Sequence, residues 1–88
     1  MSLRIVATKK PAEVTLVVSG RLVGQWIAEL TRSFDQAAVE GGSVVVDISD
    51  VSFVDRDGVA ALRNLIGRGA VLRGCPAYLA SQLEESGP

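Results

Sequence analysis

The chain has no histidine and only one cysteine, Cys75. Without histidine it lacks the commonest transition-metal ligand and the side chain that most often moves protons near neutral pH. A single cysteine excludes an internal disulfide framework, and a reducing cytoplasm is the location that we expect. We expect Cys75 to serve in packing, because there is no histidine or second thiol to activate it.

The chain also has no excess of one charge and no long apolar run. Nine basic residues stand against ten acidic ones, and the basic residues are scattered instead of forming the basic face of a nucleic-acid binder. No apolar run approaches the length of about 18 residues that crosses a bilayer. The residues after Met1 run directly into a strand pattern, without a secretory signal. We therefore expect no nucleic-acid partner and no direct membrane insertion.

Aromatic residues are few, so aliphatic side chains must supply the core. The four aromatic residues are Trp26, Phe34, Phe53 and Tyr78, while the hydrophobic fraction is 48%. A chain of 88 residues buries about 60% of its unfolded surface, which suffices for one core and leaves no room for a separate cap. The sequence predicts one domain over residues 1–88, with Trp26 in its core.

The first half of the chain predicts two strands and a helix. Residues 3–8 and 13–19 are extended patterns joined by a loop at 9–12, and the second alternates with a period of two. Residues 20–22 break this alternation, and a helical stripe ended by Gly41–Gly42 follows. Its apolar members are Val23, Trp26, Ile27, Leu30, Phe34 and Ala38.

The second half adds two strands and two helices. Residues 44–48 are mostly β-branched, which is typical of a central strand; a turn follows at Ser49–Asp50, and residues 51–54 are extended. A second helix ends at Gly67 or Gly69 and carries Val59, Leu62, Leu65 and Ile66 on its apolar face. Residues 70–72 form a short strand, and a third helix starts at Pro76 and carries Tyr78, Leu79 and Leu83. The order β-β-α-β-α-β-α predicts an α/β fold: a small mixed sheet of about four strands, with helices mainly on one face.

An acidic loop at residues 53–60 joins the central strand to the second helix. It carries Asp55 and Asp57, and we expect one of these carboxylates to cap the N–H groups at the helix start. Gly58 is expected where close backbone packing leaves no room for a side chain. Asp47, inside the strand, is expected to bond neighbouring N–H groups. The loop is compatible with either phosphotransfer or regulation.

The phosphotransfer interpretation depends on Asp55 and Asp57. Together with Gly58 they resemble the opening motif of haloacid-dehalogenase-type phosphatases, in which the first aspartate attacks phosphorus. Such enzymes also need a later lysine and a further acidic pair for Mg²⁺, whereas both lysines here lie upstream of the loop. A calcium loop with Gly58 as its sixth residue would place Phe53 first and Asn64 last, where acidic ligands are required. We therefore expect no metal, no cofactor and no catalytic residue, and keep the phosphotransfer enzyme as a remote alternative.

The regulatory interpretation covers nearly the whole chain. Residues 45–55 and 58–62 resemble the STAS domain family, which includes bacterial anti-sigma-factor antagonists and the cytoplasmic tails of sulfate transporters. In that family a hydrophobic strand with an aspartate leads through a turn to Phe-(Ile/Val)-Asp-Ser-(Ser/Thr)-Gly and an apolar helix. Residues 19–22 resemble the family's link into its first helix, and residues 74–76 lie where its last helix begins.

The resemblance implies a non-enzymatic protein-binding module that acts in transcription regulation. In phosphorylated members a partner kinase modifies the Ser or Thr before the glycine; that position is Asp57 here, and Arg56 replaces the preceding serine. Asp57 has no hydroxyl group for a serine kinase to modify, so it either imitates the modified state weakly or is a fixed feature. The partner implied is an anti-sigma factor with a serine-kinase-like fold; the alternative is a component of a membrane transport system. The residues expected to dock it are Asp55, Arg56, Asp57, Gly58, Val59 and Arg63.

Overall fold

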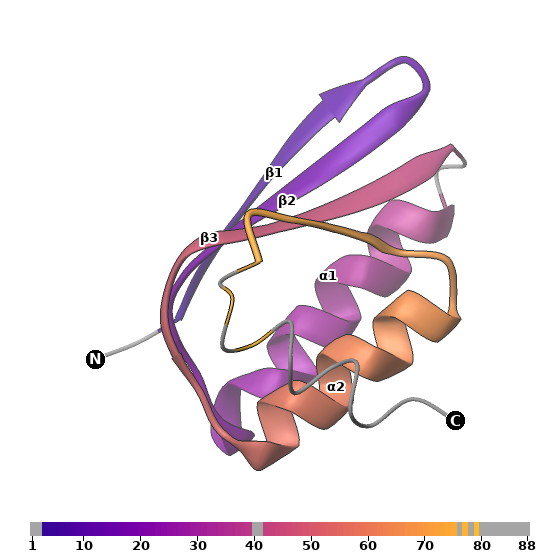
Figure 1. Ribbon diagram of the computed structural model, residues 1–88. Helices are drawn as coiled ribbons and strands as arrows, with labels where there is room; N and C mark the ends of the chain where they lie inside the picture. Colours follow the sequence, from indigo (N-terminus) through magenta and orange to yellow (C-terminus); the bar gives the residue numbers. More distant parts are fainter. Residues whose placement is uncertain (1–2, 40–41, 76, 78, 80–88) are drawn as a thin grey trace.

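The computed structural model describes residues 3–39, 42–75, 77 and 79, which form a four-stranded mixed sheet with two helices on one face (Figure 1). The strand order in the sheet is β1-β2-β3-β4, with β1 antiparallel to β2 and the other neighbours parallel. The elements are β1 (Arg4–Lys10), β2 (Glu13–Leu22), the 3-10 turn η1 (Gly24–Trp26), α1 (Ile27–Val39), β3 (Ser43–Val54), α2 (Arg56–Gly67) and β4 (Val71–Arg73). The predicted fold class is confirmed. Of the predicted third helix, Ala77 and Leu79 are described, and the rest lies outside the described residues.

The hairpin of β1 and β2 turns more tightly than the sequence predicted. Lys9 and Lys10 were expected in a loop, but they belong to β1, where Lys10 pairs with Glu13. Pro11 and Ala12 alone form the turn. Lysines on an edge strand keep their charge in water and discourage pairing with another chain, so they are compatible with strand structure here.

Strands β2 and β3 also continue through the positions where breaks were predicted. Residues 20–22 remain in β2, and Ser49–Asp50 remain in β3. The register shifts twice, between Val17 and Ser19 and between Gly20 and Arg21, which places an extra residue in β3 each time. These β-bulges absorb the turn-forming residues while the pairing continues. The two strands therefore run side by side to their ends at Leu22 and Val54.

The core lies between the sheet and the two helices. Its fully buried aliphatic side chains are Leu16, Val18, Leu22, Leu30, Val46, Ile48, Leu62, Leu65 and Leu79. Phe34 joins them, and Arg68 lies 4.9 Å above its ring and bonds Asp35 at 2.5 Å, which links α1 to the end of α2. Among the described residues, no helix is long and apolar enough to cross a membrane.

Two residues that were predicted to lie on the buried faces of the helices are exposed. Ala38 is exposed and Ala37 is buried in its place, because Ala37 lies seven residues, nearly two full turns, after the buried Leu30. Ile66 is 42% exposed, since the buried face of α2 is centred on Gly58, Leu62 and Leu65. In each case the buried residue is the one directly before the predicted residue, so each helix still turns its predicted face towards the sheet.

Candidate functional site

The loop between β3 and α2 begins with a capping aspartate. Asp55 is the N-cap of α2, in extended conformation, and its Oδ1 accepts a hydrogen bond from the N–H of Gly58 at 2.7 Å. This confirms that one of the two loop carboxylates caps the helix. Asp57 lies in the first turn, where a negative charge interacts favourably with the helix dipole.

The second oxygen of the same carboxylate reaches a different element. Asp55 Oδ2 accepts a hydrogen bond from the N–H of Gly24 at 3.1 Å, at the start of η1. The residue before Gly24, Val23, has no side-chain oxygen and makes no capping bond of its own. The N–H of Asp55 also donates to the carbonyl of Leu22 at 3.2 Å. One carboxylate therefore holds the beginnings of both helical segments, which lie at the same end of the molecule (Figure 1).

Gly58 lies in tight contact with the ends of β2 and β3. A Cβ atom at this position would lie 2.6 Å from the carbonyl oxygen of Leu22 and 2.7 Å from Cγ1 of Val54. The expectation that close packing excludes a side chain is confirmed. The close approach also brings the first turn of α2 against the ends of β2 and β3.

The structure divides the six predicted docking residues into two groups. Arg56, Asp57 and Arg63 are exposed, whereas Asp55 and Val59 are half-buried and Gly58 is buried. The Asp57 carboxylate lies over Gly24, with Oδ2 3.6 Å from the point that a Cβ there would occupy. The exposed group can contact a partner, and the buried group holds it in position.

An exposed pair next to this loop was missed by sequence reasoning. Phe53 is 45% exposed, and the guanidinium of Arg21 lies 5.2 Å from the centre of its ring. The two residues are partners in the β2–β3 register. The sequence carries no signal for this pairing, because it depends on β2 continuing past Gly20 and on the bulge that shifts the register.

Asp47 lies in the middle of β3 and bonds the chain just beyond it. Its Oδ1 accepts hydrogen bonds from the backbone N–H of Ser49 at 3.0 Å and from the Ser49 hydroxyl at 2.7 Å, as the sequence predicted. These bonds hold the pKa of Asp47 below its ordinary value; partial burial opposes the shift, and the charge of Arg73 adds to it. The role of Asp47 in the structure is local bonding.

Asp47→Asn is expected to lower stability in a pH-dependent way. Because the pKa of Asp47 is lower in the folded chain, its contribution is present above the unfolded pKa of about 3.9 and is lost as pH falls through the folded pKa. The site is open to solvent, so the effect at pH 7 is at most about 1 kcal/mol. Urea unfolding at pH 7 and pH 3 measures it, with Asp50→Asn, an exposed neighbour, as control. An equal difference at both pH values would contradict this assignment.

Asp55→Ala is expected to destabilise the chain by about 1–2 kcal/mol, because both N–H groups lose their acceptor. Asp57→Ala, which removes a carboxylate from the same helical turn without removing the cap, should cost about 0.3–1 kcal/mol. Chemical denaturation gives the two values. Amide hydrogen exchange should accelerate at both Gly24 and Gly58 in Asp55→Ala; acceleration at Gly58 alone would mean that the bond to Gly24 contributes nothing.

The other residues singled out by sequence are packed side chains. Cys75 is half-buried against the core, and burial raises the pKa of its thiol, which lowers its reactivity at neutral pH. Trp26 was predicted in the core, but it is half-buried and is not among the buried core residues; its indole N–H is buried and has no hydrogen-bond partner among the described residues. Within the described residues, no three Asp, Glu, Cys or His side chains are grouped as a metal site would require.

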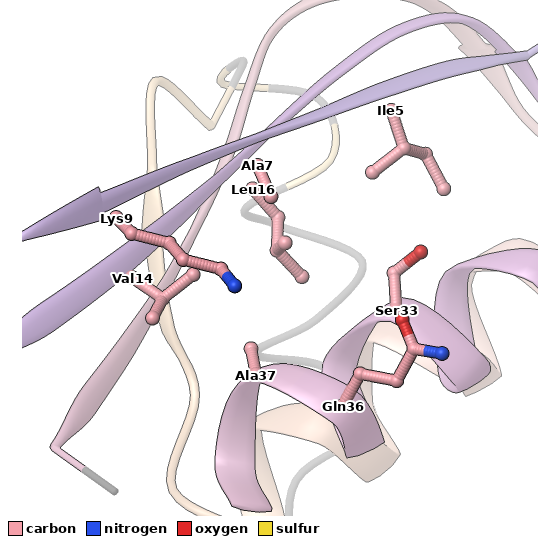
Figure 2. A pocket seen from close by; sticks show the side chains of 8 residues that line it. All are labelled: Ile5, Ala7, Lys9, Val14, Leu16, Ser33, Gln36 and Ala37. Atoms are coloured by element: carbon pink, nitrogen blue, oxygen red, sulfur yellow. The ribbon is translucent and has the colours of Figure 1, made fainter. Parts of the chain in front are cut away.

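A cavity of about 250 Å³ lies away from the loop, between the β1–β2 hairpin and α1 (Figure 2). Its walls are mainly aliphatic, and Lys9, Ser33 and Gln36 bring polar groups to it; the other lining residues are Ile5, Ala7, Val14, Leu16 and Ala37. None of the residues predicted to dock a partner lines it.

Comparison with protein families matches residues 4–85 to the STAS domain, and the chain belongs to this family. An anti-sigma factor antagonist from Mycobacterium paratuberculosis is similar in structure, with a TM-score of 0.76 at 17% identity over 96% of this chain and 79% of the other. The anti-sigma factor antagonist SpoIIAA in its unphosphorylated form gives 0.73 at 14% identity, over 99% and 84%. The STAS domain of an antagonist from Rhodobacter sphaeroides gives 0.66 at 18% identity, over 82% and 86%. A comparison with curated proteins gave no match.

Proposed function

We propose that the chain is a non-enzymatic binding module that docks a protein partner through the β3–α2 loop and the exposed face of α2. The observation that carries the proposal is the loop itself: Arg56 and Asp57 are exposed on a helix start that is fixed by Asp55 and Gly58. Exposed polar side chains on a rigid support are typical of a recognition surface. Similarity to solved anti-sigma factor antagonists supports an anti-sigma factor, with a serine-kinase-like fold, as the partner.

The bonding of Asp55 favours binding over phosphotransfer. A phosphatase of the dehalogenase type would use this residue as its nucleophile, yet both of its oxygens accept hydrogen bonds from backbone N–H groups. Both oxygens therefore already have backbone partners that hold the carboxylate in place at the start of α2. The STAS family assignment supports the same conclusion.

Asp57 makes this module different from one that a serine kinase switches. It stands immediately before Gly58, has no hydroxyl group, and carries one negative charge, where a phosphate carries about 1.5 to 2. We propose that position 57 is not phosphorylated, and that the whole of residues 1–88 acts as one STAS domain in a bacterial cytoplasm.

The test partner is an anti-sigma factor with a serine-kinase-like fold, sought first among the products of the neighbouring genes. Calorimetric titration with the unmodified chain should show binding, and incubation with the factor and ATP should add no phosphate by intact-mass analysis. Asp57→Ser should accept one phosphate, which peptide mapping places at residue 57; Asp57→Ala is the matched variant without an acceptor. Ser52→Ala in each background excludes phosphate on the nearby exposed serine.

Three outcomes would contradict the proposal. Magnesium-dependent hydrolysis of phosphate esters by the purified chain, abolished in Asp55→Asn, would support phosphotransfer. Phosphate mapped to residue 57 of the unmodified chain would contradict the claim that this position is not phosphorylated. If the chain binds a transporter subunit encoded nearby and no anti-sigma factor, its function is regulation of membrane transport.

A further inference from the structure

The corner where β2 and β3 end presents an aromatic ring to solvent. Phe53 is 45% exposed although it lies in a strand, and Arg21 covers one face of its ring at 5.2 Å. A guanidinium within about 6 Å of a ring centre is attracted by the negative face of the ring. Phenylalanine and arginine are both enriched at protein interfaces relative to the rest of the surface.

The backbone beneath this pair is fixed before any partner arrives. Arg21 and Phe53 are register partners, and the next pair, Leu22 and Val54, is buried. The hydroxyl of Ser52 donates to the carbonyl of Gly20 at 3.1 Å, and the N–H of Asp55 donates to the carbonyl of Leu22 at 3.2 Å. A side chain held on such a support loses little conformational entropy when a partner covers it.

Exposed arginines lie beside this corner. Arg21 and Arg56 are exposed, and Arg63 lies two turns after Arg56 on the same face of α2. Of the two loop carboxylates, Asp57 is exposed, whereas Asp55 is half-buried and both of its oxygens accept hydrogen bonds from the N–H groups of Gly58 and Gly24. A surface of this kind is complementary to carboxylates.

We propose that Phe53 and Arg21 anchor the docking surface, and that the partner presents an apolar recess bordered by Asp or Glu side chains. The inference rests on the proposed function and adds two residues, from β2 and β3, to the loop and helix. Burial of an aromatic ring at the centre of an interface supplies much of its binding energy, and the surrounding charges set the rate of association and its dependence on salt.

The test measures binding of the complete chain to the same anti-sigma factor by surface plasmon resonance, at several salt concentrations. Phe53→Ala should weaken binding about 10- to 100-fold. Arg21→Glu should slow association and reduce its dependence on salt. The controls are Val71→Ala, a 55% exposed valine on β4, and Lys10→Glu, an exposed lysine at the hairpin end of β1; both should bind as the unmodified chain does. Thermal unfolding checks that every variant is folded.

The outcomes separate this inference from the proposed function. If the unmodified chain binds but Phe53→Ala matches Val71→Ala within about twofold, the anchor is wrong and the docking function stands. If Arg21→Glu and Lys10→Glu change association equally, the net charge of the chain explains the effect and the acidic border is wrong. If the unmodified chain does not bind, both the proposed docking function and the role of Phe53 and Arg21 are wrong.

Discussion

Gly58→Ala should destabilise the chain by about 3 kcal/mol, a large share of the stability of a small domain. The added methyl group would lie 2.6 Å from the carbonyl oxygen of Leu22 and 2.7 Å from Cγ1 of Val54. The backbone carbonyl cannot rotate away, so the first turn of α2 must move. This movement would lengthen the 2.7 Å bond between Gly58 and Asp55 and turn Asp57 away from its present position.

The same helix offers a matched control in Gly67→Ala. A Cβ atom at Gly67 would have no atom within 4 Å, and alanine favours helix over glycine by up to about 1 kcal/mol. Urea unfolding should therefore show a large loss for Gly58→Ala and no loss for Gly67→Ala. Equal stabilities of the two variants would mean that Leu22 and Val54 adapt freely, and the tight contact at the loop would be wrong.

Leu62→Ala should cost about 2–5 kcal/mol. Leu62 is fully buried on the face of α2 that packs towards the sheet, so its removal loses apolar burial and leaves a cavity beneath the helix. For a domain of this size, each kcal/mol lowers the melting temperature by about 4–8 °C. Thermal unfolding followed by circular dichroism measures the change.

Ile66→Ala removes a comparable aliphatic side chain from the same helix, at a position that is 42% exposed. Its expected cost is below about 1 kcal/mol, because much of that side chain already contacts water. If Ile66→Ala lowers the stability as much as Leu62→Ala does, Ile66 must be buried, as the sequence pattern predicted. The buried face of α2 would then be rotated towards Ile66.

Much of the fold was predictable because local patterns and tertiary structure agree. The alternation in residues 13–19, the β-branched run at 44–48 and the spacing of Leu62 and Leu65 each specify an element and its buried face. Strand continuation was not predictable. Gly20 and Ser49–Asp50 have turn-forming propensities, and only pairing with a neighbouring strand and the resulting bulges keep them extended.

The candidate site was predictable in its local part. An aspartate before an apolar helix predicts an N-cap, and Asp55 fulfils this role. Its second bond, to Gly24, joins residues 31 positions apart in the sequence and depends on where β2 ends. The exposure of Phe53 beside Arg21 has the same origin, since it follows from a register that the bulges set. The expected protein-binding role of the loop remains a prediction.

The two hydrogen bonds that Asp55 accepts limit how this loop can be moved to another protein. Because residues 22–24 and residues 54–58 share one carboxylate, the recognition loop is built from two distant stretches of chain. A graft of residues 54–58 onto another scaffold would leave one oxygen of Asp55 without its donor and would free the helix start to tilt. A transplant that keeps the geometry must carry both stretches and must preserve the close approach of Gly58 to Leu22.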